Sequence, residues 1–400
     1  MSKFYTSFIV FLLAILLSAN CVFAQTENVD MSKYITLTVT QGETIKLKMI
    51  ASSENTGVKV VSGTWDTTFI ASTLSTASFE NCTAASTTMT IYGNIQTLNA
   101  STYENVSKIT TLDASHNTAL KSIACYNLLL TDLNVSGLTS LRSLDCNGNR
   151  LESLDVNGLT SLKDLYCFGN RLTTLDVSEI ARLERLICDN NQLTSLNLAG
   201  VTNLEVLDCS NNQLTNLDVS ELTSLQFLYC GRNQLTSLDI SGLTSLIDLY
   251  CYNNQLSTQT IDRLYCQLPD RTAQSTAGSI APASSSSDAI VLATNKSNAT
   301  SKRWIVMYKS GENECTQLNA TTGTYVCGSE EEPGPEPSAL SDVVTEGIIL
   351  YPNPAKEEVT LKGIRGEDVK VFDLRGKLVK QETINEKLDI RDLESGVYYI

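Results

Sequence analysis

Seven cysteines that recur every 21 residues are the side chains in this sequence whose type and spacing first suggest chemistry. They are Cys125, Cys146, Cys167, Cys188, Cys209, Cys230 and Cys251. If each lay on one strand of a parallel ladder, neighbouring thiols would point the same way, ~4.8 Å apart. A disulfide needs Cβ atoms ~3.8 Å apart with converging bonds, and four thiolates on zinc must converge at ~2.3 Å. The spacing therefore favours a column of small, buried and unreactive thiols over disulfides or zinc sites.

Four cysteines of the expected mature chain lie outside this column. Two of them, Cys315 and Cys327, flank a predicted turn at 319–323, so a local disulfide between them is plausible. Cys82 and Cys266 are then unpaired, and the sequence does not settle their state. The mature chain would carry eleven cysteines, an odd number.

The composition argues against catalysis. His116 is the only histidine, and the formal net charge is -15 at pH 7. That charge disfavours nucleic acids and anionic membrane surfaces as partners. The motifs H-E-x-x-H, G-x-S-x-G, the P-loop and zinc-spaced Cys/His pairs do not occur. We therefore expect no enzyme, no metal and no cofactor.

The cysteine column belongs to an internal repeat. Residues 138–156 read LTSLRSLDCNGNRLESLDV, and the same frame of Leu, Cys and Asn returns every 21 residues through Cys251, with a degenerate copy at 120–135 and a partial one at 109–114. The pattern resembles the leucine-rich repeat L-x-x-L-x-L-x-x-N-x-L, with Cys in the third leucine position. It is most similar to the cysteine-ladder repeats of internalin J and similar bacterial surface proteins.

The repeat predicts a mainly β solenoid of 21-residue coils over residues 94–271. Each Leu-x-Leu/Cys segment would be a short strand, and strands of successive coils would pair in parallel. A coil this short leaves little room for a helix on its back, so we expect 3₁₀ turns or extended segments there.

A second column holds one asparagine per coil, just after the strand. Its members are Asn149, Asn170, Asn191, Asn212, Asn233 and Asn254, while Leu128 breaks the column in the first coil. We expect each amide to point inward and to bond backbone groups of its own and the next coil, which would otherwise be buried without partners. A ligand-binding role is the less favoured alternative.

The flanks of the array predict caps and a linker. Alternating strands in residues 25–93 predict a β-rich N-terminal cap, which a repeat array needs over its open edge. Residues 272–327 predict the opposite cap, and the acidic, proline-rich residues 328–337 predict an extended linker.

The N-terminus predicts export. Lys3, the apolar run 8–17 and the small residues Val22 and Ala24 at the -3 and -1 positions indicate a signal peptide over residues 1–24. Ten apolar residues are too few for a membrane anchor, and Cys21 raises the alternative of a lipoprotein, although Asn20 fits a lipid-attachment box poorly. No later stretch is long and apolar enough to cross a membrane.

Residues 338–400 carry a second resemblance. The segments IILYPNPA, VKVFDLRGKLV, LDI and GVYY follow in order and resemble the C-terminal sorting domain of type 9 secretion substrates. The resemblance implies a small β-sandwich, passage through the outer membrane of a Bacteroidetes-type cell, removal by a sortase-like protease and attachment to surface lipopolysaccharide. Family members usually continue past G-V-Y, whereas this sequence stops at Ile400, so we expect a truncated sorting domain.

Aromatic side chains gather on one predicted face of the solenoid. Residues that flank the inward Leu and Cys should form columns on the concave face, where we predict a ligand-binding patch of Tyr166, Phe168, Phe227, Tyr229, Asp248, Tyr250 and Tyr252. Exposed aromatics on a rigid sheet are typical of interaction surfaces. The alternative is that they only stabilise cross-strand neighbours.

These features together predict a secreted or cell-surface protein that binds a protein or glycan on a host or sister cell. Adhesion or host interaction is the first hypothesis. A structural role in cell–cell association or a biofilm matrix is the second. The type 9 secretion machinery and its sortase would be further partners.

Overall fold

The computed structural model describes residues 29–51, 53, 56–69, 71, 79–101, 109–311 and 314–328 in full, and the backbone of Ile70, 349–350, 358–373, 378–389 and 398–399. The chain divides into two compact units, Met1–Ser329 and Glu330–Ile400. The predicted signal peptide and all but the first residue of the predicted linker lie outside these ranges. Within them, no helix is both long and apolar enough to cross a membrane.

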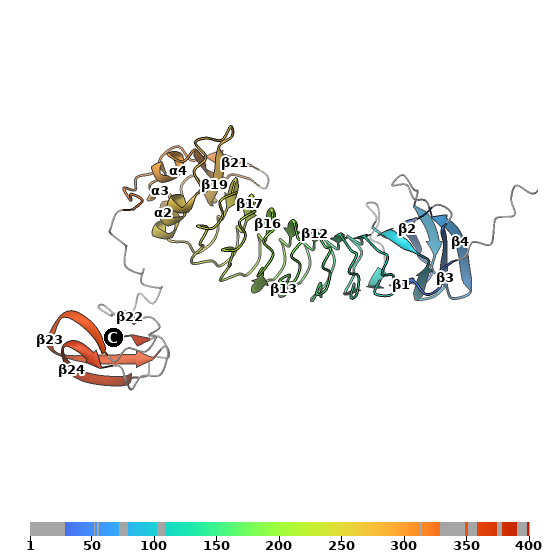
Figure 1. Cartoon of the computed structure of the whole chain (residues 1–400), viewed down its shortest axis with the longest axis horizontal. Helices are drawn as coiled ribbons and strands as arrows, with labels where there is room; N and C mark the ends of the chain where they lie inside the picture. The colour runs from blue at the N-terminus through green and yellow to red at the C-terminus, as the bar shows by residue number, and fades with distance from the viewer. Residues whose placement is uncertain are drawn as a thin grey trace, which may run out of the picture. The chain divides into compact units, whose positions relative to one another are not determined.

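The first unit is built on a parallel ladder with one strand per coil (Figure 1). Successive strands are offset by one 21-residue repeat, as in the pairing of Leu144 with Leu165 and of Leu165 with Leu186. The ladder strands are β9 (Ser122–Ala124), β11 (Ser143–Asp145), β12 (Asp164–Tyr166), β14 (Arg185–Ile187), β16 (Val206–Asp208), β17 (Phe227–Tyr229) and β18 (Asp248–Tyr250). We call the solvent-facing side of these strands the ladder face.

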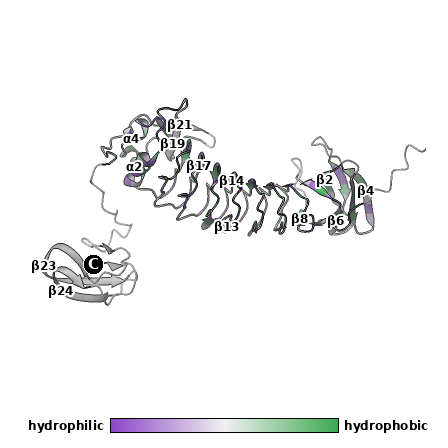
Figure 2. Ribbon diagram, in the orientation of Figure 1, coloured by the Kyte–Doolittle hydropathy of each residue, from purple (hydrophilic) through white to green (hydrophobic). Residues whose placement is uncertain are grey.

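The inward positions of the coils form one continuous apolar core. The middle residue of each ladder strand is buried, and all seven ladder cysteines are 0% exposed. Figure 2 shows hydrophobic residues recurring in coil after coil along the array. Burial raises the pKa of every ladder thiol above its ordinary value, so the thiols pack as apolar groups, as the spacing argument predicted.

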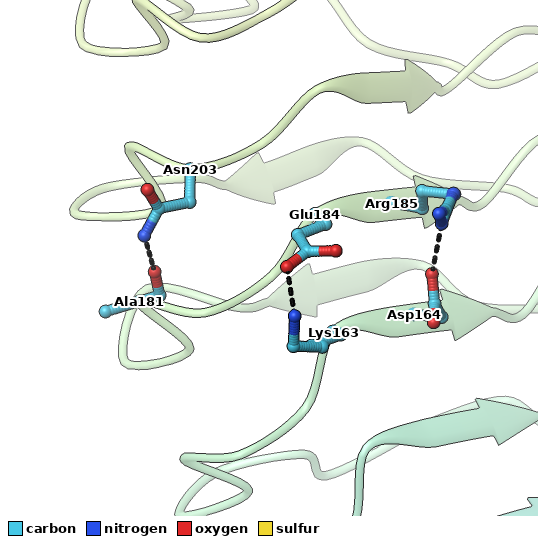
Figure 3. Close-up of polar contacts among 6 residues, drawn as sticks. All are labelled: Lys163, Asp164, Ala181, Glu184, Arg185 and Asn203. Carbon is cyan, nitrogen blue, oxygen red and sulfur yellow. Dashed lines mark hydrogen bonds and ion pairs between the residues drawn. The ribbon is translucent and has the colours of Figure 1, made fainter.

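The backs of the coils consist of turns and short extended segments. Two of these segments, β13 (Thr174–Asp176) and β15 (Ser195–Asn197), pair in parallel. Between residues 109 and 257 the structure contains no helix. Successive coils also meet through side chains, with ion pairs Lys163–Glu184 and Asp164–Arg185 and a hydrogen bond from Asn203 to the Ala181 carbonyl (Figure 3).

The asparagine column supplies hydrogen bonds to buried backbone. Asn191 Nδ2 donates to the carbonyls of Cys167 (3.0 Å) and Cys188 (3.1 Å), and its Oδ1 accepts from the Leu172 N–H (3.0 Å). Each asparagine thus bridges its own coil and the preceding coil, whereas we expected the next coil. Each asparagine bonds the preceding coil because the buried leucine N–H that needs an acceptor belongs to that coil.

The first coil, where Leu128 replaces asparagine, departs from this pattern. Leu128 is fully buried, and Leu129 adopts a left-handed φ of 101°. Asn149 Oδ1 accepts from the N–H groups of Leu128, Leu129 and Leu130 at 3.0–3.2 Å. The Asn149 oxygen therefore accepts from two N–H groups, those of Leu128 and Leu129, in addition to the one that each later asparagine serves.

The N-terminal cap is a β-sandwich whose two sheets continue into the solenoid. One sheet runs β4 (Trp65–Ala71), β3 (Thr56–Ser62), β6 (Thr88–Tyr92), β1 (Tyr34–Val39), β8 (Ile109–Asp113) and β10 (Asp132–Asn134). The other runs β5 (Glu80–Thr83), β2 (Thr44–Ala51) and β7 (Ile95–Asn99), and β7 pairs with β9 of the ladder. The cap thereby covers the edge that the first coil would otherwise expose.

The C-terminal cap closes the other end of the ladder. Helix α2 (Thr258–Gln267) follows the last coil, and the cap also contains α3 (Ala289–Leu292) and α4 (Ser297–Thr300). Three strands extend the long sheet: β19 (Gly278–Ala283), β20 (Trp304–Lys309) and β21 (Cys315–Gln317). Trp304 is buried and donates to the Pro269 carbonyl at 2.8 Å.

The predicted Cys315–Cys327 disulfide is wrong. Cys327 is bonded to Cys266 at the end of α2, and Cys315 is a free, half-buried thiol. The chain after β21 does not return along that strand. It is held instead beside α3 and α4, where Thr322 N–H donates to the Leu292 carbonyl (2.8 Å) and Asn295 Nδ2 donates to the Tyr325 carbonyl (2.7 Å). That path carries Cys327 to α2.

The second unit contains β22 (Ile349–Leu350), β23 (Glu358–Asp373), β24 (Leu378–Asp389) and β25 (Tyr398–Tyr399). These strands form one antiparallel sheet in the order β22-β25-β23-β24. The resemblance implied a sandwich, and the described strands of this unit account for one layer of it.

Replacing Asn191 by Ala should destabilise the solenoid by about 3 kcal/mol. The Leu172 N–H would be buried without an acceptor, and the Cys167 and Cys188 carbonyls would each keep only one of their two amide donors, from Asn170 and Asn212. Denaturant unfolding of the purified chain measures this change. Asn203→Ala is the matched control, since it removes one exposed hydrogen bond and should cost less than about 1 kcal/mol. Equal effects of the two substitutions would show that the asparagine column does not act as described.

Alkylation of the native protein with iodoacetamide should modify Cys315 and spare the seven ladder thiols, because burial both shields them and disfavours the thiolate. Mass spectrometry of non-reduced peptides should link Cys266 to Cys327. Unfolding in guanidinium before alkylation should expose all ladder cysteines. A native ladder that reacts as fast as Cys315 would contradict the buried column.

Candidate functional site

The coil register places the predicted patch residues in continuous columns on the ladder face. Tyr229 pairs with Asp208 on one side and Tyr250 on the other, and Phe227 pairs with Asp248. The rings of Tyr229 and Tyr250 are 5.0 Å apart at an interplanar angle of 48°. Two neighbouring coils thus present an aromatic pair at the C-terminal end of the ladder.

An open pocket of about 510 Å³ lies beside this pair. Its lining comes from four successive coils and one strand of the C-terminal cap: Asp189, Asn190, Asp208, Ser210, Asn211, Tyr229, Arg232, Tyr250, Tyr252 and Lys309. We call this the tyrosine–aspartate pocket. Tyr166, Phe168, Phe227 and Asp248, which we also predicted as ligand-binding, are not among the residues that line it.

Tyr252 forms one wall of the pocket, and its ring lies against Gly231 of the preceding coil. A Cβ atom at Gly231 would come within 2.8 Å of the Tyr252 ring, so any other residue at that position would force the ring to move. Tyr252 is accordingly 8% exposed, whereas Tyr229 and Tyr250 are half-buried. Burial raises the pKa of all three hydroxyls above its ordinary value, so they stay protonated well beyond physiological pH.

Two carboxylates of adjacent coils share the pocket. Burial, with repulsion from Asp208, raises the pKa of Asp189 to about 6, although a hydrogen bond from Asn190 opposes the shift. Burial also raises the pKa of Asp208, against the hydrogen bonds from Ser210 and the charge of Lys309. Each carboxylate is thus held in an environment that disfavours its ionised form.

Two other acids of the same face have partners outside the pocket. Asp164 pairs with Arg185 at 3.0 Å, and Asp248 accepts a hydrogen bond from the Ser279 hydroxyl. Within the described part of the chain, neither Asp189 nor Asp208 lies at ion-pairing distance from a cation. The pocket therefore combines aromatic walls with two acids that have no ion-pair partner among the described residues.

Sequence reasoning missed seven residues of the pocket lining, which are Asp189, Asn190, Asp208, Ser210, Asn211, Arg232 and Lys309. Asn190, Asn211 and Arg232 occupy the position before each ladder asparagine and adopt left-handed φ of 53–56°, and the run of Gly and Asn at that position was the available signal. Asp189, Asp208 and Ser210 flank ladder cysteines, as the predicted tyrosines do, and that shared position was the available signal for them. Lys309 comes from β20, and nothing in the sequence places that strand against the ladder.

His116 lies away from this site, at the N-terminal junction. Its ring stacks on Tyr34 with centroids 4.3 Å apart, and its Nδ1 is 3.1 Å from the Ser115 hydroxyl. No cluster of three or more His, Cys, Asp or Glu in the described ranges is arranged to hold a metal ion.

Asp189→Asn should raise the melting temperature at pH 7.5 by about 2 °C. The native state holds the Asp189 proton to about pH 6, whereas the unfolded chain releases it near pH 4. Stability from this group is therefore greatest at low pH and is lost as the pH rises through that window. Calorimetry at pH 7.5 and pH 4 measures the effect, and the gain should vanish at pH 4. An equal gain at both pH values would contradict the assignment.

Comparison with known families identifies two parts of the chain. The family of leucine-rich repeats in two copies matches residues 181–224, 202–240 and 223–264. The family of secretion system C-terminal sorting domains matches residues 349–400. A search of curated proteins found no match.

Three solved structures illustrate what the chain resembles. A leucine-rich repeat protein of Leptospira interrogans is 31% identical over 38% of this chain and 42% of its own, with a TM-score of 0.37. The functional domain of internalin J from Listeria monocytogenes, described as including a cysteine ladder, is 26% identical over 56% of each chain, with a TM-score of 0.38. An internalin F from Listeria monocytogenes is 28% identical over 38% of this chain and 47% of its own, with a TM-score of 0.35. The chain spans about half the length of these proteins.

The repeat fold is typically a binding scaffold without enzymatic activity, and neither matching family is catalytic. The sorting domain indicates secretion across the outer membrane to the cell surface or the extracellular space. The chain is therefore a leucine-rich repeat protein with a cysteine ladder and a secretion system C-terminal sorting domain.

Proposed function

We propose that this protein is an exported adhesion or recognition protein that binds a protein or glycan on a host cell through the C-terminal end of its ladder face. The tyrosine–aspartate pocket is the observation that carries this proposal. Aromatic side chains on a rigid sheet bury large areas at little cost in conformational entropy. A pocket with aromatic walls and a few convergent polar groups is the usual form of a binding site.

The position of the pocket supports the same function. Its walls stand on β16, β17 and β18, which are locked into the ladder by backbone hydrogen bonds on both sides. A preorganised site loses little freedom when its partner binds. Cross-strand stabilisation alone would explain the Tyr229–Tyr250 contact, but it gives no reason for two partly buried acids beside it.

A structural role in cell–cell association or a biofilm matrix is the alternative function. It requires the same surface to bind sister cells rather than a host target. Removal of the sorting domain by a sortase-like protease, and attachment of the released protein to lipopolysaccharide, stay predictions from the family resemblance.

Substitution of both Tyr229 and Tyr250 by Ser should reduce cell binding at least about tenfold and lower the melting temperature by only a few degrees, because one aromatic pair is worth about 1 kcal/mol. Fluorescently labelled full-chain protein would be titrated onto epithelial cells and onto its own bacteria. The Phe double variant, which keeps both rings, is the matched control and should retain most of the binding.

The cell type that binds decides between the two roles. Variant-sensitive binding to epithelial cells supports host adhesion, and binding restricted to sister cells supports the matrix role. Equal binding by the wild type and the Ser double variant would overturn the proposed site.

A further inference from the structure

The tyrosine–aspartate pocket has an acidic side formed by one residue from each of two coils. Asp208 ends β16, and Asp189 follows the cysteine of the coil before. The hydrogen bonds that these carboxylates accept come from their own turns, from Asn190 to Asp189 and from the Ser210 N–H to Asp208 (3.0 Å). Two like charges held near each other in a partly desolvated site repel, and a cation between them would relieve that repulsion.

The tyrosine side of the pocket is also suited to a cationic group. Tyr229 and Tyr250 present a tilted pair of rings, and Tyr252 lies against Gly231. Ring faces attract cations electrostatically, and they also pack well against the aliphatic stem of a long basic side chain. Carboxylates and aromatic rings together are thus complementary to a long side chain with a charged end.

We propose that this pocket anchors one lysine or arginine side chain of a protein partner, with the charged end between Asp189 and Asp208 and the aliphatic stem against the tyrosines. The inference rests on the proposed function and narrows its ligand class to a protein with an exposed basic residue. Arg232 and Lys309, which also line the pocket, would then face acidic groups that neighbour the basic residue on the partner.

Charge complementarity distinguishes this occupant from a neutral glycan. A glycan can stack on tyrosines and accept or donate hydrogen bonds, but it does not require ionised carboxylates. A bound cation does require them, so its affinity should fall as Asp189 takes up its proton near pH 6. The other titratable or charged groups that share the pocket are Asp208, Arg232, Lys309 and the three tyrosines.

The test uses the full chain and two short probes, acetyl-Gly-Lys-Gly-amide and its Gln counterpart, followed by NMR or calorimetric titration. The Lys peptide should bind at least about tenfold more tightly than the Gln peptide at pH 7.5, and weaken severalfold at pH 5 and in high salt. Asp189→Asn combined with Asp208→Asn should abolish the preference for Lys, since charge-assisted hydrogen bonds would be lost.

Asp145→Asn is the matched control. Asp145 occupies the strand position equivalent to Asp208, and burial likewise raises its pKa, but it lies outside the pocket. This variant should keep the full preference for Lys. Equal binding of the two peptides, binding of neither, or binding of a neutral glycan that the Asn double variant retains would overturn the proposal.

The result is separable from that of the cell-binding experiment. If the tyrosine variant loses cell binding while the Asp189/Asp208 variant keeps it, the binding face stands and the basic-residue anchor is wrong. If both variants bind cells normally, the proposed function itself is wrong.

Discussion

The hydrogen bonding of buried backbone at the strand exits is the constraint on which this structure depends. Each coil turns sharply just after its cysteine, and the turn would leave carbonyls and an N–H buried without partners. One asparagine per coil supplies both donors and an acceptor, as Asn212 does for the Cys188 and Cys209 carbonyls and the Leu193 N–H. Because the same amide joins two coils, it also fixes their register.

The register between coils determines which side chains are neighbours in the core and which are neighbours on the surface of the ladder. Inside, it stacks Leu on Leu and Cys on Cys, and it keeps the thiols parallel instead of converging. Outside, it stacks residues 21 positions apart, so Asp208, Tyr229 and Tyr250 become neighbours. The repeat therefore determines which side chains are neighbours on the surface. A substitution at one outward position changes one side chain in a regular array and leaves the positions of the others unchanged.

The two acids of the tyrosine–aspartate pocket occupy positions that lower the stability of the fold. Asp189 and Asp208 are placed where burial disfavours their charge, whereas Asp164 on the same face is paired with Arg185. A long array with a continuous core can tolerate this cost, because each coil is stabilised by both of its neighbours. The binding role that we propose for the pocket would give a reason for retaining these unfavourable charges.

The sequence alone determined the solenoid, its period, the inward Leu and Cys, and the aromatic columns, because a 21-residue repeat leaves each side chain only one place in a parallel ladder. The tertiary structure decided what depends on contacts between distant segments. The α2 helix, the Cys266–Cys327 bond and the approach of Lys309 to Tyr250 all arise in the C-terminal cap, where no repeat constrains the path. The sequence likewise did not show whether each asparagine bonds the preceding or the next coil. That choice depends on which neighbouring N–H is left buried in three dimensions.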